Sequence, residues 1–265
     1  MMSQSPSMLA PILLTLAAAA GYLVLALRQQ AGSRGWSRWR TTLFLSGCGL
    51  LLLGLSPQAL PFPEGDFRKH MLEHLLLAML APIGLVMAAP ITLLLRTLSS
   101  QNGRKVTAVL RSPYLQVIAN LVVALVLDLG GMAALYFTPL YMAMMRQPAL
   151  HYLVHLHFLA AGCLYTWVIA GPDPAPHRAS VPVRLCVLAV AIVTHSVLSQ
   201  WLYAGWHVAI PVSATQLQQG AELMYYGGDI AEMLLAICLV TSWHPARVQR
   251  VDQPSRAAWL SPSDQ

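Results

Sequence analysis

Seven apolar runs, each about as long as a membrane-spanning helix, occupy most of this chain of 265 residues. A helix needs about 20 largely uncharged residues to cross the hydrocarbon core of a bilayer. The runs cover residues 8–27, 41–60, 67–95, 113–136, 150–170, 183–203 and 221–243. Only 10% of the residues are charged and 57% are hydrophobic, whereas a soluble domain carries about 25% charge. The sequence therefore predicts an integral membrane protein.

The apolar runs lack the alternation of apolar and polar residues that marks the strands of a membrane barrel. Lipid offers no hydrogen bonds to a bare backbone, so a span without strand character must be a helix. We therefore expect an all-α fold. A single seven-helix transmembrane bundle would occupy residues 1–245, and a short cytoplasmic tail would follow at residues 246–265.

Basic residues fall on alternate connections between the runs. Of the 16 Lys and Arg residues, 13 lie on one set of connections and in the tail, and the other set holds Arg68, Lys69 and Arg146. Loops rich in Lys and Arg stay in the cytoplasm, so we expect the N-terminus outside and the C-terminus inside. The first run is expected to be a retained span and not a cleaved signal peptide. The net charge of +6 then reflects topology and contact with anionic lipid, not nucleic-acid binding.

Two pairs of histidines repeat the same spacing at the starts of two runs. His70 and His74 are four residues apart, with Met71 between them, and His151 and His155 repeat the interval. Residues four apart lie on one face of a helix, about one turn from each other. Each pair can therefore hold one ion or one partner group.

Three other runs each carry an ionisable residue, namely Asp128, His195 and Asp229. At a rise of about 1.5 Å per residue from the outer ends of the runs, these three residues, His74 and His155 all lie about 8 to 12 Å deep. Ionisable groups inside a membrane are costly and usually face a partner within the bundle.

We therefore predict one outward-facing metal-binding layer. Its candidate ligands are His70, Met71, His74, Asp128, His151, His155, His195 and Asp229. Imidazole, carboxylate and thioether groups suit copper at least as well as zinc.

Several segments match the pattern of a known family. They are His70-Met71-Leu72-Glu73-His74 with the proline-bearing run after it, the segment 151–167 followed by Gly171-Pro172-Asp173-Pro174-Ala175-Pro176, and the segment 219–229. In these segments the chain resembles the caa(3)-type cytochrome c oxidase assembly factor family, whose members are seven-helix membrane proteins. The resemblance implies a non-catalytic role in assembling a haem-copper oxidase in the bacterial plasma (inner) membrane. An oxidase subunit would be the partner and copper the metal supplied to it.

The residues alone leave other functions open. A copper transporter would need polar residues that continue toward the cytoplasm, and the runs have almost none. A membrane cytochrome would hold haem between His74 and either His155 or His195. A metal-dependent hydrolase would use such a site to activate water, but the chain lacks the His-Glu-x-x-His pattern. The copper-binding assembly factor is the preferred function, and the sequence leaves open whether the chain forms a homo-oligomer.

Overall fold

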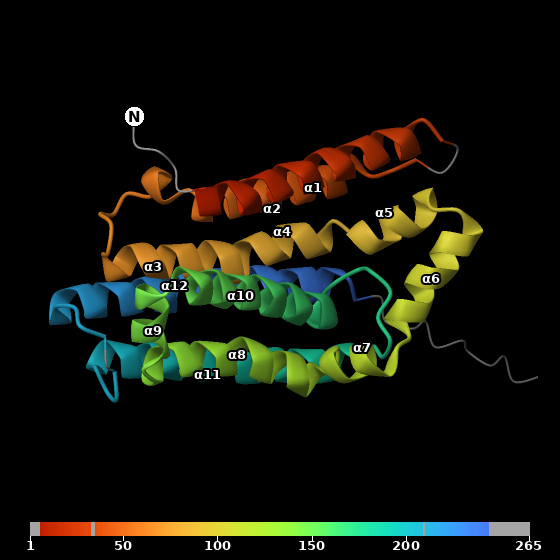
Figure 1. Cartoon of the computed structure of the whole chain (residues 1–265). Coiled ribbons are helices and arrows are strands. Elements are labelled where there is room, and N and C mark those ends of the chain that lie inside the picture. Colours follow the sequence, from red (N-terminus) through yellow and green to blue (C-terminus); the bar gives the residue numbers. More distant parts are fainter. Residues whose placement is uncertain (1–5, 33–34, 209, 244–265) are drawn as a thin grey trace, which may run out of the picture.

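The computed structural model describes residues 6–32, 35–208 and 210–243, and these residues form helices without any strand. The long helices run side by side along one direction (Figure 1). In chain order the helices are α1 (Pro6–Gln30), α2 (Arg38–Gly54), η1 (Pro57–Ala59), α3 (Phe67–His74), η2 (Leu75–Leu80), α4 (Ala81–Met87), α5 (Pro90–Thr97), α6 (Ser100–Leu110), α7 (Pro113–Ile118), α8 (Leu121–Phe137), α9 (Leu140–Arg146), α10 (Pro148–Ile169), α11 (Val181–Ala204) and α12 (Ala214–Thr241). The predicted all-α architecture is confirmed.

The number of possible membrane spans is smaller than predicted. Among the described residues, five helical segments are long and apolar enough to cross a bilayer: Leu9–Gln30, Phe67–Thr97, Pro148–Ile169, Val181–Ala204 and Ala214–Thr241. A sixth span results if α8 and α9, which are bent by 78° relative to each other, count as one. Helix α2 has only 17 residues, fewer than the roughly 20 that a span needs. The predicted count of seven is therefore not confirmed.

The third run forms one long helical segment with two irregularities. Between α3 and α4 the chain makes a π-helical turn, η2, which ends just before Pro82. After α4 the helix stops at Ala89, which has a left-handed backbone with φ of 56°, and α5 starts at Pro90. Proline lacks an amide hydrogen and disfavours a helical residue before it. The long helix is therefore broken directly before Pro90.

The run predicted over residues 113–136 is divided into two helices. The side-chain oxygen of Asn120 accepts hydrogen bonds from the amides of Val122 and Val123, at 2.9 and 3.4 Å. Asparagine at this position favours a new helix start because it satisfies amides that have no partner in the preceding turn. The long apolar helix therefore begins at Leu121, and the residues before Asn120 form the short helix α7.

The π-helical turn lies at the centre of the bundle, where it contacts α2, α10 and α12. Two close approaches of helices depend on glycine. A Cβ atom on Gly162 of α10 would collide with the carbonyl oxygen of Ala78 in η2. A Cβ atom on Gly47 of α2 would lie 2.7 Å from the backbone nitrogen of Leu85 in α4. Small residues of this kind let membrane helices pack closely.

Apolar side chains cover much of the outer face of the bundle. Their exposed fractions reach 71% at Leu14 on α1, 61% at Val126 on α8 and 63% at Val193 on α11. A surface of this kind is suited to lipid. The connections that hold most basic residues lie together at one end of the bundle, and α3 begins near α9 at the other end (Figure 1).

Candidate metal centre

The start of α3 positions the predicted ligand His70 and a carboxylate, Glu73. Asp66 precedes the helix and accepts a hydrogen bond from the amide of Arg68 at 2.9 Å. This cap defines the first helical residue and therefore the face on which later side chains lie. His70 and Glu73 follow at a spacing of three residues, so both project from the same side of α3.

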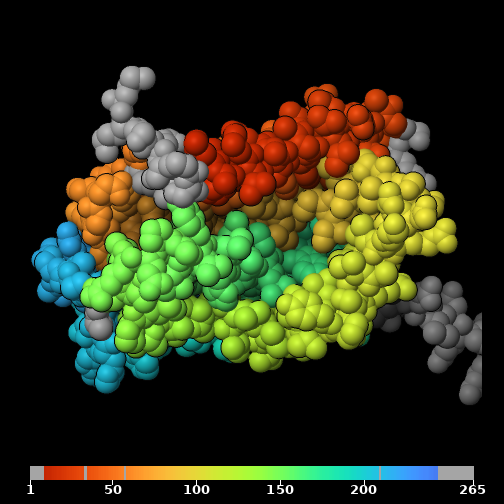
Figure 2. Space-filling model, viewed as in Figure 1, coloured from red at the N-terminus to blue at the C-terminus, as the bar shows by residue number. Residues whose placement is uncertain are grey.

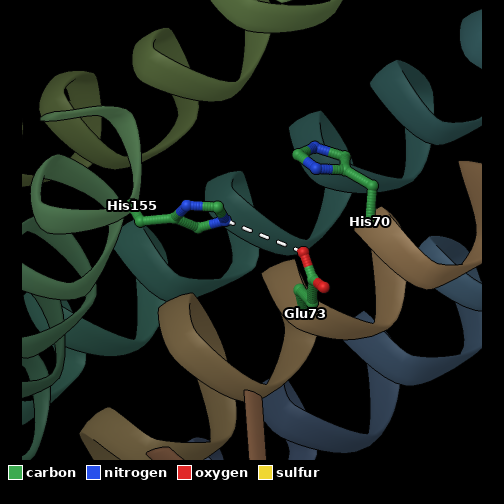
Figure 3. Close-up of side chains that lie close together, drawn as sticks. All are labelled: His70, Glu73 and His155. Atoms are coloured by element: carbon green, nitrogen blue, oxygen red, sulfur yellow. Dashed lines mark ion pairs between the residues drawn. The ribbon is translucent and has the colours of Figure 1, made fainter. Parts of the chain in front are cut away.

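Three potential ligands from two helices meet beside α3. His70 and Glu73 of α3 and His155 of α10 each offer a ligand atom, and these atoms all lie within 4.8 Å of one another. Nε2 of His155 lies 4.0 Å from a carboxylate oxygen of Glu73, and the three side chains point into one space (Figure 3). We call these three residues the His–Glu cluster.

Neighbouring side chains orient the cluster. The hydroxyl of Tyr136 and Nε2 of His70 share a hydrogen bond of 3.2 Å, which leaves the other ring nitrogen of His70 for an ion. Nε2 of His155 is buried without a hydrogen-bond partner. The ring of His151 lies one turn away from that of His155, with 4.3 Å between the ring centroids. An imidazole fixed through one nitrogen presents the other in a defined direction.

The cluster opens into a cavity of about 530 Å³, which we call the wide cavity. Its polar lining consists of Thr15, Glu64, Asp66, Lys69, His70, Glu73, Tyr141, His151, Tyr152 and His155. The remaining lining comes from α1, α2, α10 and their neighbours and is apolar, apart from the thioether of Met145. On the face shown in Figure 2, the surface is hollowed between α1 and α10. The cluster thus has protein ligands on one side and free space on the other.

Acidic groups outnumber basic ones around the wide cavity. Glu64, Asp66 and Glu73 contribute carboxylates, and Lys69 is the basic residue among the described residues of the lining. The ammonium group of Lys69 is paired with Glu64 at 2.6 Å. Asp66 is paired with Arg68 at 2.5 Å, and the hydrogen bonds from Arg68 lower the pKa of Asp66. In the part of the chain that the structure describes, Glu73 is paired with His155 at 4.0 Å and with no Lys or Arg, so its carboxylate can bind a cation.

A second group of polar residues lies deeper in the bundle. A cavity of about 40 Å³, the deep cavity, is lined by His74, Asp128, His195 and Glu232, together with apolar and weakly polar side chains. Nδ1 of His195 lies 4.0 Å from a carboxylate oxygen of Glu232. The two cavities share no lining residue.

The structure divides the predicted layer of ligands. His70, His151 and His155 line the wide cavity, whereas His74, Asp128 and His195 line the deep cavity. Met71 is fully buried in the apolar core and lines neither cavity. Asp229 also lines neither one, although it lies on α12 one turn before Glu232.

Two carboxylates in these sites were not among the predicted ligands, namely Glu73 and Glu232. Each follows a predicted ligand by three residues, Glu73 after His70 and Glu232 after Asp229. Residues three apart lie on one helix face, so this spacing could have identified both carboxylates as candidate ligands.

The local pattern His70-x-x-Glu73-His74 resembles a zinc hydrolase motif in reverse order. In such enzymes both imidazoles hold one metal ion, and the carboxylate acts on the bound water. Here His70 lines the wide cavity and His74 lines the deep cavity. The arrangement therefore does not match that of a zinc hydrolase.

Comparisons with known proteins agree with the sequence pattern. The family model Caa3_CtaG, described as cytochrome c oxidase caa3 assembly factor, matches residues 18–245. Uncharacterized proteins of Mycobacterium bovis and Mycobacterium tuberculosis are each 32% identical over 253 residues, covering 88% of this chain and 38% of the relative. An uncharacterized protein of Mycobacterium leprae is 30% identical over 183 residues, covering 66% of this chain and 28% of the relative. The chain thus spans less than two fifths of the length of these curated relatives, and no solved structure matches it.

Proposed function

This chain belongs to the cytochrome c oxidase caa3 assembly factor family, and we propose that it binds copper at the His–Glu cluster and delivers it to a subunit of a haem-copper oxidase. The observation that carries this proposal is the convergence of His70, Glu73 and His155 within 4.8 Å. Two imidazoles and one carboxylate are ligands that a copper ion accepts. The carboxylate also offsets part of the charge of the ion.

The open side of the cluster favours delivery over a structural role for the metal. Closed sites with four protein ligands hold structural ions, whereas three protein ligands leave a position free. Here that position would face the wide cavity of about 530 Å³. A ligand from the partner can enter this space and bind the ion before the last protein ligand leaves, so copper is never released into water.

We place the cluster near the outer side of the plasma membrane. Connections rich in Lys and Arg stay in the cytoplasm, and the cluster lies toward the opposite end of the bundle from most basic residues. With α2 and the bent α8–α9 pair counted as spans, the chain would cross the membrane seven times, with its N-terminus outside. Copper would then be received from, and passed to, sites on the outer side.

Transport of copper through the bundle is a less well supported hypothesis. Beyond the deep cavity lies a second apolar core, which includes Ala124, Trp167, Val168, Leu188 and Leu239. A metal ion that continued toward the basic end would have to pass these side chains without ligands, which is costly in a membrane interior.

The test is to remove the cluster and measure the oxidase. We expect the double variant His155→Ala, Glu73→Gln to be inserted at normal levels while cells grown with limiting copper lose most haem-copper oxidase activity. Added copper should restore activity, because mass action can replace a delivery step. His157→Ala is the matched control: His157 lies two residues along α10, hydrogen-bonds the carbonyl of Leu127 at 3.1 Å and lines neither cavity.

Two results would contradict delivery. Full oxidase activity in the double variant under copper limitation would mean that the cluster is not needed. Lost activity that copper does not restore would mean that the chain acts as a scaffold for the immature subunit.

A further inference from the structure

The deep cavity is much smaller than the wide cavity. Its volume is about 40 Å³, against about 530 Å³. It lies where η2, α8, α10, α11 and α12 meet. It therefore has room for a small occupant, such as a few water molecules or an ion.

Polar atoms around the deep cavity have no partners. Both ring nitrogens of His195, Nδ1 of His74, Oε2 of Glu232 and the hydroxyl of Tyr165 are buried without a hydrogen bond. His195 is only 2% exposed and Glu232 only 5%. Unpaired buried polar groups reduce the stability of a fold, and they usually indicate a bound water or ion.

The charge of the lining favours a cation. Asp128 and Glu232 both line the cavity, and no Lys or Arg is among its lining residues in the described part of the chain. Two carboxylates inside a membrane bundle are costly unless a positive charge accompanies them. A neutral water molecule alone would leave that cost in place.

The donor atoms favour a soft cation. Besides His74 and His195, the thioether-bearing residues Met79 and Met132 line the cavity. Thioether and imidazole ligands together select Cu(I) over hard cations. The separation of 4.0 Å between Nδ1 of His195 and Oε1 of Glu232 lets one ion bind both, since each such bond is about 2 Å long.

We propose that the deep cavity is a second metal site, which holds one soft cation such as Cu(I) and is separate from the His–Glu cluster. Neighbouring packing supports this placement. A Cβ atom on Gly228 would collide with the ring of His195, so glycine at that position lets the imidazole lie against α12. The ring of Tyr136 stands edge-on to both His70 and His74, with centroid distances of 5.9 and 6.2 Å, and so packs beside one histidine of each site.

The sites can be counted by titrating the purified full chain in detergent with Cu(I) under anaerobic conditions. We expect two bound ions per chain in the wild type and one in His155→Ala, in which only the deep site remains. The X-ray absorption spectrum of the copper left in His155→Ala should contain a sulfur ligand, because both thioethers lie at the deep cavity.

Two further substitutions in the His155→Ala background identify the deep site. His195→Gln should remove the remaining ion. Met132→Leu, which conserves volume and therefore folding, should weaken the binding of that ion at least tenfold. Met224→Leu is the matched control, because Met224 is equally buried but lines neither cavity.

The inference fails if His155→Ala binds no copper, in which case the occupant is water or a proton. It also fails if the remaining ion is unaffected by both Met132→Leu and His195→Gln. If the wild type binds one ion and His155→Ala binds none, the His–Glu cluster is supported as a metal site and the deep site is excluded. The converse outcome is that the wild-type chain binds two ions while the double variant His155→Ala, Glu73→Gln still supports normal oxidase assembly. That pair of results would contradict the delivery function and support the deep site.

Discussion

The side chain of Asp173 accepts two hydrogen bonds from Thr92, one from the backbone amide at 2.7 Å and one from the hydroxyl at 2.5 Å. It also accepts a bond from the amide of Ile91 at 2.9 Å. These amides begin α5, directly after the break at Ala89, and have no partner within the helix. Arg178 donates to the carbonyl oxygens of Gly171 and Asp173. The connection between α10 and α11 therefore stabilises the start of α5, directly after the break in the long helix.

Replacing Asp173 should destabilise the protein. Asp173→Ala removes the acceptor from two partly buried amides, and we expect a loss of about 2 kcal/mol, measured as a lower unfolding temperature in detergent. Asp173→Asn keeps one oxygen and should lose less. Equal unfolding temperatures for wild type and Asp173→Ala would show that this contact does not hold the break.

The cap at the start of α3 should make stability depend on pH. The hydrogen bonds from Arg68 lower the pKa of Asp66 in the folded chain. The stabilisation is therefore fully present above the unfolded value of about 3.9, and it is lost as the pH falls through the lower folded value. The gap in unfolding temperature between wild type and Asp66→Asn should be constant above about pH 5 and shrink below about pH 4. A gap that persists unchanged at the lowest pH would exclude the charge of Asp66 as its cause.

Two glycines on α2 offer a matched test of helix packing. A Cβ atom on Gly47 would lie 2.7 Å from a backbone atom of α4, whereas one on Gly49 would have no neighbour within 4 Å. Gly47→Ala should therefore cost about 1 to 3 kcal/mol of stability, and Gly49→Ala should be neutral or slightly stabilising. Thermal unfolding of the two variants checks both expectations. Similar behaviour of the two would mean that α2 and α4 can separate without cost.

The orientation of the chain can be tested with reporter fusions. Because 13 of 16 basic residues lie on one set of connections and in the tail, fusions after Ser100 and after Pro172 should both report the cytoplasm. A reporter signal from the outer side at either point would reverse the placement of the His–Glu cluster.

The sequence allowed the helical class to be predicted, because the length and hydropathy of the runs are local properties. The family was predicted from its resemblance in the segments around His70 and His151 and in segment 219–229. The start of α8 was missed, because one cap at Asn120 interrupts a run that is otherwise uncharged. A cap acts through two hydrogen bonds and leaves little trace in average hydropathy.

The division of the predicted ligand layer could not be foreseen from depth alone. Counting residues gives the height of His74 and His155 along their helices, but not the rotation of each helix about its axis. That rotation depends on which neighbours fill the grooves between helices. It directs His74 to the deep cavity and His155 to the wide cavity.

The π-helical turn over Leu75–Leu80 also sets the angular register of the long third helix. Residues four apart share a face of an α-helix, whereas a π-helical turn closes over five residues. His74 and Met79 are five residues apart across this turn, and both line the deep cavity. One extra residue in this apolar stretch thus brings an imidazole and a thioether of the same long helix to one cavity.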